Sequence, residues 1–143
     1  MAFENPSRDE IKQILTNSQT VAVVGLSDDP SKVSHSVSEA MQAKGYTIIP
    51  VNPKADTILG EKAYKALADV PVPIDIVNVF RRPEFTPDIA REAVAAGAKT
   101  LWLQLGIAND EAAAIAGAAG LNVIMDRCIK VEDSILLPQG KSY

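Results

Sequence analysis

The 143-residue chain is poor in the residues that build metal and disulfide sites. Its single cysteine, Cys128, excludes an internal disulfide and any metal site with several cysteine ligands. Its single histidine, His35, likewise excludes a histidine-rich metal centre. We therefore expect no metal site. No histidine is evident as a partner for Cys128, so we expect no catalytic thiol either.

The chain also lacks an excess of positive charge and long apolar runs. Its net charge is −4 and its pI is near 4.9, which argues against a nucleic-acid partner. No apolar run approaches the roughly 20 residues that span a bilayer. The start, MAFENPSRDE, has neither the basic nor the apolar region of a secretory signal. We expect one cytoplasmic domain covering residues 1–143, with no membrane partner.

The sequence does contain short apolar runs that alternate with amphipathic segments. The runs predict five strands, at Val21–Val24, Tyr46–Val51, Ile74–Phe80, Lys99–Leu103 and Leu121–Met125. Helices are predicted near residues 7–15, over Val33–Lys44, over Glu61–Leu67, from Thr86 as N-cap to Gly97, and over Asp110–Ala119. This alternation predicts an α/β fold in three layers, a doubly wound five-stranded parallel sheet with helices on both faces.

Ligands of such sheets bind outside the carboxyl ends of the strands, where the strand order reverses. The loops after the first four predicted strands are therefore the places to look for a site. They are Gly25–Lys32, Asn52–Asp56, Arg81–Pro83 and Gln104–Asn109.

The first loop is typical of a phosphate site. In TVAVVGLSDDPSKVS an apolar strand ends at Gly25, and a short polar loop leads into a helix that begins near Lys32. Gly25 permits a sharp turn and close ligand approach, and Ser27 can bond a phosphate oxygen. The loop matches neither G-x-G-x-x-G nor the nucleoside-triphosphate P-loop, and an ordinary strand-to-helix turn is the alternative.

The second loop places Asn52-Pro53-Lys54 where NAD-binding domains usually carry an acidic residue. A lysine at this position favours a phosphorylated ribose, as in coenzyme A (CoA) or NADP. The alternative is that Lys54 is one solvated lysine among several.

The third loop carries Phe80, Arg81 and Arg82, and two arginines at a strand end can clamp an anion. Phe80 can pack against an adenine. Alternatively, Phe80 belongs to the core and one arginine pairs with Glu84 or Asp88, so we expect one arginine at the ligand.

In the fourth loop Gln104 can bond a ribose, an adenine or an amide of the ligand, or it can tie two loops together. His35, in the first turns of a helix, fits a structural or solvated role better than a catalytic one, since no carboxylate or serine is evident as its partner.

Six ordered motifs resemble the small stand-alone CoA-binding proteins of bacteria and archaea. They are VAVVGLSDDPSK, GYTIIPVNPK, LGEKAYKALADVP, DIVNVFRRPEF, GAKTLWLQLGI and GLNVIMDRCIK. The similarity covers about residues 20–132. That family is related to the CoA-binding domain of the succinyl-CoA synthetase alpha subunit, so the resemblance implies a Rossmann-like domain.

The resemblance also implies that CoA lies across the carboxyl strand ends. The first loop would hold the diphosphate, the second would lie by the 3′-phosphorylated ribose and adenine, the third would flank the nucleotide, and the fourth would meet the pantetheine arm. The residues implied are Gly25, Leu26, Ser27, Lys32, Asn52, Pro53, Lys54, Phe80, Arg81, Leu103, Gln104 and Leu105.

The chain departs from the synthetase pattern in two ways. The synthetase has a phosphorylated histidine in a second domain and needs a beta subunit, and neither is in these 143 residues. Ligase activity is therefore not implied. In addition, Asp28-Asp29-Pro30 replaces a second glycine of the synthetase loop.

We expect a CoA or acyl-CoA binding module without catalysis of its own, which carries or senses CoA or docks with an enzyme. The alternatives are an NADP-dependent oxidoreductase or an NAD(P)-binding regulatory domain, which Lys54 and Arg81 permit, and a scaffold with a vestigial pocket. No group of residues suited to catalysis converges on the predicted site.

Overall fold

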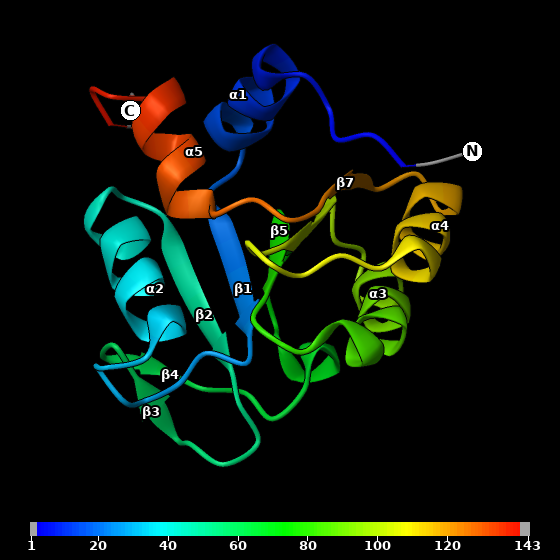
Figure 1. Cartoon of the computed structure of the whole chain (residues 1–143). Helices are drawn as coiled ribbons and strands as arrows, with labels where there is room; N and C mark the ends of the chain where they lie inside the picture. The colour runs from blue at the N-terminus through cyan, green and yellow to red at the C-terminus, as the bar shows by residue number, and fades with distance from the viewer. Residues whose placement is uncertain (1–2, 141–143) are drawn as a thin grey trace.

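Five parallel strands in the order β2-β1-β5-β6-β7 form the centre of the computed structural model, which describes residues 3–140 (Figure 1). They are β1 Thr20–Val24, β2 Thr47–Val51, β5 Ile76–Val79, β6 Thr100–Leu103 and β7 Asn122–Ile124. The chain leaves β1 for β2 on one side and returns to β5 on the other. The strand order therefore reverses at the carboxyl ends of β1 and β5. The predicted doubly wound parallel sheet is confirmed.

Helices cover both faces of this sheet, which gives the predicted three layers (Figure 1). Helices α1 (Arg8–Asn17), α2 (Val33–Ala43) and α5 (Ile129–Leu136) lie on one face, and α3 (Thr86–Ala95) and α4 (Asp110–Ala118) on the other. A hydrophobic core lies on each face of the sheet, and alternate residues of β6 point into one or the other. Trp102 packs on the side of α1, α2 and α5, and Leu101 and Leu103 pack on the side of α3 and α4. Because both faces are covered, the strands are mostly apolar, and the buried Asn78 of β5 is an exception.

Three helix ends follow the sequence prediction. Ser7 and Glu10 form a capping box at the start of α1. The Asn109 side chain caps α4 by accepting a 2.9 Å hydrogen bond from the Ala112 backbone N–H. Gly45 follows α2 in the left-handed region, with φ of +104°. These local contacts fix where the helices begin and end.

The predicted helix over Glu61–Leu67 is wrong. A two-stranded hairpin of β3 (Thr57–Ile58) and β4 (Glu61–Lys62) stands there, followed by a single 3-10 turn, η1 (Leu67–Asp69). Leu59 and Gly60, the two residues of the hairpin turn, both have positive φ, of 55° and 74°. A two-residue turn with positive φ at both positions matches the twist of a hairpin, and here it outweighs the helical spacing of the apolar residues.

The prediction of Thr86 as an N-cap is also wrong by one residue. A 3-10 turn, η2 (Pro83–Phe85), precedes α3, and Phe85 occupies the cap position. The Thr86 hydroxyl donates to the Pro83 carbonyl at 2.6 Å. The hydroxyl therefore closes the preceding turn, and does not accept a bond from α3. Helix α5 was not predicted.

Within residues 3–140, none of the helices combines the length and the apolar character needed to cross a membrane.

Asp75 joins the amino ends of the central strands, and we expect it to make stability depend on pH. Burial alone would raise the pKa of Asp75, but bonds from the Thr20 and Gln19 backbone N–H groups (2.9 and 2.8 Å) and the charge of Lys99 together lower it. The stabilisation is therefore present above the ordinary pKa of about 3.9 and lost as pH falls through the lower folded-state pKa.

Denaturant titrations between pH 7 and pH 2 check this expectation. Asp75→Asn should lower the unfolding free energy at pH 7 by about 1–2 kcal/mol and should weaken its decline in acid. Asp56→Asn, a change at an exposed carboxylate, is the control. An acid profile that Asp75→Asn leaves unchanged would contradict the assignment.

Candidate functional site

A cleft of about 420 Å³ opens at the carboxyl ends of β1 and β2, next to α3. Its floor is formed by strand-end residues and its walls by the segments that follow β2, β4 and β5. The residues that line it are Val24, Gly25, Val51, Asn52, Pro53, Lys54, Lys65, Ala66, Leu67, Arg81, Ile89 and Glu92. This is the edge where a doubly wound sheet binds its ligands.

Residues from the first three predicted loops meet in this cleft. They are Gly25, Asn52, Pro53, Lys54 and Arg81. The other predicted site residues do not line it: Leu26, Ser27, Lys32, Phe80, Leu103, Gln104 and Leu105 lie around or beneath the same edge.

Three cations, Lys54, Lys65 and Arg81, gather at the cleft, together with one acid, Glu92. Within residues 3–140 none of the three cations forms a salt bridge. The Lys65 ammonium donates to the Pro53 carbonyl at 3.2 Å, which ties the two lysine-bearing segments together. In a chain of net charge −4, this arrangement produces a local positive potential suited to an anion.

Sequence reasoning missed Lys65, Ala66, Leu67, Ile89 and Glu92. The first three belong to the predicted helix over Glu61–Leu67. Because a hairpin stands at the start of that range instead, these residues lie at the strand ends, where the sequence analysis did not place them. One sequence feature was available: Gly60, four residues before Tyr64, favours a turn, although Leu59 before it is not a residue that readily adopts a positive φ. Tyr64 then pairs with β2, because the Tyr64 N–H donates to the Pro50 carbonyl and the Asn52 N–H to the Tyr64 carbonyl. Lys65 is thereby carried to the end of β2.

Gly25 allows two loops to approach each other closely. Its φ is +87°, and an added Cβ would lie 2.6 Å from the Phe80 carbonyl oxygen and 3.1 Å from the Arg81 Cδ. Glycine avoids both the backbone strain and the clash. The position therefore brings the ends of β1 and β5 together at the cleft.

The loop between β1 and α2 is held by hydrogen bonds to its neighbours. The Ser27 N–H donates to the Ser34 Oγ at 3.0 Å, the His35 Nδ1 lies 2.9 Å from the Ser27 carbonyl, and the Asn52 Nδ2 donates to the Leu26 carbonyl at 2.9 Å. The structural role considered for His35 agrees with this contact. The loop is thus fixed from both α2 and the end of β2.

The carboxylate of Asp29 is hydrogen-bonded within its own loop. Its Oδ1 accepts hydrogen bonds from the Ser31 N–H at 2.9 Å and the Ser31 hydroxyl at 2.8 Å. These two bonds, the backbone bond first, lower the pKa of Asp29 despite a small opposing effect of burial. The carboxylate is thus committed to a local turn. Lys32, the exposed N-cap residue of α2, makes no side-chain cap bond.

Both arginines after β5 lie near Phe85, since the guanidinium carbons of Arg81 and Arg82 are 4.8 and 5.3 Å from its ring centroid. Arg81 lines the cleft and Arg82 does not. The carboxylate of Asp88 pairs with Arg91 at 2.7 Å, not with either arginine. Phe80 is half-buried and packs against the core on the α2 side.

The end of β6 and the loop that follows it contain residues in three different environments. Leu103 is fully buried, Gln104 is buried, and Leu105 is 69% exposed. The Gln104 Nε2 donates to the Asn78 Oδ1 of β5 at 2.7 Å, so Gln104 links two neighbouring strands in this structure.

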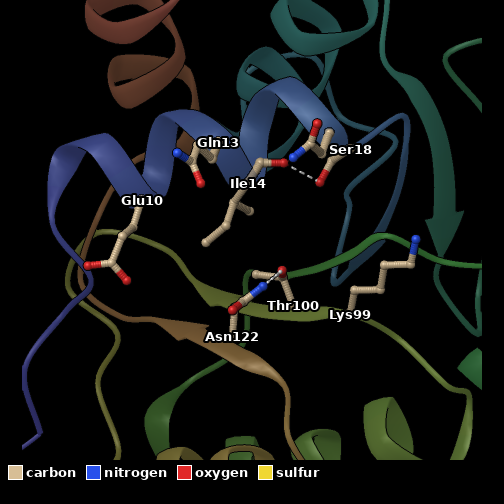
Figure 2. Close-up of a pocket in the computed structure, with 8 residues that line it drawn as sticks. Glu10, Gln13, Ile14, Ser18, Lys99, Thr100 and Asn122 are labelled. Carbon is tan, nitrogen blue, oxygen red and sulfur yellow. Dashed lines mark hydrogen bonds between the residues drawn. The ribbon is translucent and has the colours of Figure 1, made fainter.

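A second hollow, of about 290 Å³, lies at the opposite end of the sheet, between α1 and the amino ends of β6 and β7 (Figure 2). Its polar side chains come from α1 (Glu10, Gln13) and from the strand starts, where the Asn122 Nδ2 donates to the Thr100 Oγ1 at 3.2 Å. None of the predicted site residues lines this hollow.

The chain matches one known family over most of its length. Residues 19–134 match the model of the CoA binding domain. The chain belongs to the CoA binding domain family. The match covers the sheet, helices α2, α3 and α4, most of α5 and the cleft, and it confirms the resemblance found in the motifs.

The relatives include stand-alone proteins and parts of larger enzymes. The uncharacterized protein YneT of Bacillus subtilis is 52% identical over 133 residues, which cover 93% of this chain and 98% of YneT. The ADP-forming acetate–CoA ligase of Methanocaldococcus jannaschii is 29% identical over 92 residues, which cover 64% of this chain and 13% of the ligase. The chain thus corresponds to a small part of that ligase.

A solved structure of a hypothetical protein from Pyrococcus horikoshii has the same fold, with a TM-score of 0.89 and 34% identity. The superposition covers 96% of this chain and 99% of the Pyrococcus protein. The Rossmann-like fold implied by the resemblance is confirmed.

Proposed function

We propose that the protein binds CoA, or an acyl-CoA, through its 3′-phospho-ADP moiety at the carboxyl ends of the strands. The observation that carries this proposal is the convergence of Lys54, Lys65 and Arg81 on one cleft without carboxylate partners among the described residues. Membership of the CoA binding domain family supports the identity of the ligand.

In this proposal the ligand's phosphates occupy two places. The diphosphate lies on the loop of Gly25, Leu26 and Ser27 near Lys32, and Arg81 approaches it from β5. The 3′-phosphate lies between Lys54 and Lys65, whose segments are joined by the Lys65–Pro53 hydrogen bond. Charge-assisted bonds of this kind are the strong ones in phosphate recognition.

The remaining parts of CoA are assigned to the remaining predicted residues. The adenine rests beside Pro53 against the apolar wall of the cleft, and Phe80 flanks the nucleotide from the segment after β5. The pantetheine arm passes the segment of Leu103, Gln104 and Leu105, where the exposed Leu105 offers an apolar contact. The Asn52 side chain, which bonds the Leu26 carbonyl, supports the loop beneath the diphosphate.

We propose further that the protein acts without catalysis, as a carrier, a sensor or a docking module for an enzyme. Among the residues that line the cleft there is one carboxylate, Glu92, and no histidine, cysteine or hydroxyl side chain. Such a lining suits binding more than nucleophilic or acid–base chemistry. The similarity to YneT spans 98% of YneT, which shows that this domain can make up nearly the whole of a relative.

Isothermal titration with CoA, 3′-dephospho-CoA, NADP and NAD tests the proposal. We expect CoA to bind about 30-fold more tightly than 3′-dephospho-CoA, because the latter lacks the phosphate assigned to Lys54 and Lys65. NADP and NAD should bind more weakly than CoA. A preference for NADP would contradict the proposal and favour a dinucleotide-binding function. If none of the four compounds produced a heat change, the result would contradict any nucleotide function of the isolated chain.

A further inference from the structure

The loop between β1 and α2 must present N–H groups, not carbonyl oxygens, if it is to hold a diphosphate. A carbonyl oxygen facing a phosphate would repel it, and a peptide N–H facing it would bind. The hydrogen bonds of Leu26, Ser27 and Asp28 show how the chain can set this orientation.

The peptide group between Leu26 and Ser27 is held at both ends. Its carbonyl accepts from the Asn52 Nδ2 at 2.9 Å, and its N–H donates to the Ser34 Oγ at 3.0 Å. This peptide group is therefore fully engaged with neighbouring side chains, and its N–H is not available to a ligand.

The peptide group between Ser27 and Asp28 is held at its carbonyl alone. The His35 Nδ1 lies 2.9 Å from the Ser27 carbonyl oxygen, and because that oxygen can only accept, Nδ1 carries the proton. In a trans peptide the C=O and N–H point in opposite directions, and no peptide bond of residues 3–140 is cis. The bond to His35 therefore directs the Asp28 N–H away from the His35 ring.

That N–H has no partner in the structure. Within residues 3–140 the backbone N–H groups of Leu26 and Asp28 donate no hydrogen bond, whereas Gly25 donates to the Val51 carbonyl at 3.1 Å. We infer that His35 is a positioning residue of the proposed CoA site: by binding the Ser27 carbonyl it holds the Asp28 N–H, beside that of Leu26, in place for the diphosphate. The inference rests on the proposed function for the identity of the anion.

His35→Leu and His35→Asn form a matched pair that tests this role. The two side chains are similar in size, but asparagine carries an N–H donor near the position of Nδ1 and leucine carries none. We expect His35→Leu to weaken CoA binding about five- to tenfold, because a loop that is only partly in the competent orientation binds with reduced apparent affinity. His35→Asn should stay within about twofold of the wild type. Equal losses in both variants, or a loss in neither, would overturn the inference.

A second pair covers the case in which His35→Leu does not fold. Ser34→Ala removes the acceptor of the Ser27 N–H, and Ser38→Ala removes a hydroxyl that is buried on the same helix without a hydrogen-bond partner in the described part of the chain. Ser34→Ala should weaken CoA binding severalfold, and Ser38→Ala should not. Thermal unfolding of each variant separates a loss of affinity from a loss of folded protein.

The histidine spectrum tests the anchoring without any ligand. Because His35 is the single histidine, a nitrogen-15 NMR spectrum of the imidazole at pH 8 reports its tautomer without overlap. We expect the Nδ1–H tautomer, and an Nε2–H tautomer would overturn the inference whatever the ligand. A wild-type protein that shows this tautomer but binds no CoA would instead contradict the proposed function.

Discussion

Replacing Gly25 with alanine is expected to destabilise the protein by about 3 kcal/mol and to abolish CoA binding. An alanine Cβ would lie 2.6 Å from the Phe80 carbonyl oxygen, and the backbone would be held at a φ of +87°. The carbonyl belongs to the chain immediately after a buried strand, so it cannot move aside as a flexible side chain would. Relief of the clash would separate the ends of β1 and β5, which form the floor of the site.

Gly97→Ala is the matched control for this prediction. Gly97 also has a positive φ, of +74°, but an added Cβ would meet no atom within 4 Å. Its replacement should therefore cost about 1 kcal/mol, from backbone strain alone, and should leave CoA affinity unchanged. Denaturant unfolding and titration of both variants check the difference. Equal destabilisation by the two substitutions would show that close approach at Gly25 is not what the fold requires.

The double variant Lys54→Ala/Lys65→Ala is expected to bind CoA about 30-fold more weakly, while its affinity for 3′-dephospho-CoA changes little. Each exposed ammonium that contacts the 3′-phosphate should contribute about 1 kcal/mol, and the two together correspond to about 30-fold. The preference for CoA over 3′-dephospho-CoA should then disappear. The wild-type affinity should also fall as salt is added, because both lysines are exposed.

Lys12→Ala/Lys99→Ala removes the same charge at the other end of the molecule and serves as the control. Lys12 lies on α1 and Lys99 precedes β6, both at the amino ends of the strands. If this control weakens CoA binding as strongly as the cleft variant does, the effect is one of net charge, and the assignment of the 3′-phosphate to Lys54 and Lys65 is contradicted.

The sheet could be predicted from the sequence because its signals are local and agree with one another. Continuous apolar runs gave the five strands, and Ser7, Gly45 and Asn109 marked helix ends that the structure reproduces. Capping side chains and left-handed glycines act within a few residues of one another, so they can be recognised without knowledge of the fold.

The segment after β2 was misjudged because two local patterns compete there. Helical spacing favoured a helix over Glu61–Leu67, and the Leu59-Gly60 turn favoured a hairpin. The pairing of Tyr64 with the edge strand β2 adds backbone hydrogen bonds that no local pattern contains. Because of this error Lys65 was not placed beside Lys54, since its position there depends on that pairing.

The geometry of the loop between β1 and α2 could not be predicted either, because it also depends on contacts between distant segments. Gly25 and Lys54 were expected at the site, but the contacts of Ser27 with Ser34 and His35 depend on how α2 is set against the loop. The bond between Gln104 and Asn78 likewise joins residues 26 positions apart. Such contacts are formed by the assembled sheet and can be read only from its structure.

The most direct test of where CoA binds is one titration of nitrogen-15-labelled protein with CoA, followed through its backbone amide signals. Our account predicts the largest changes at Leu26, Asp28, Lys54, Lys65 and Arg81, at the carboxyl ends of the strands. Changes centred instead on Gln13, Asn17 and Asn122, around the hollow beside α1, or no changes at all with CoA in excess, would contradict it.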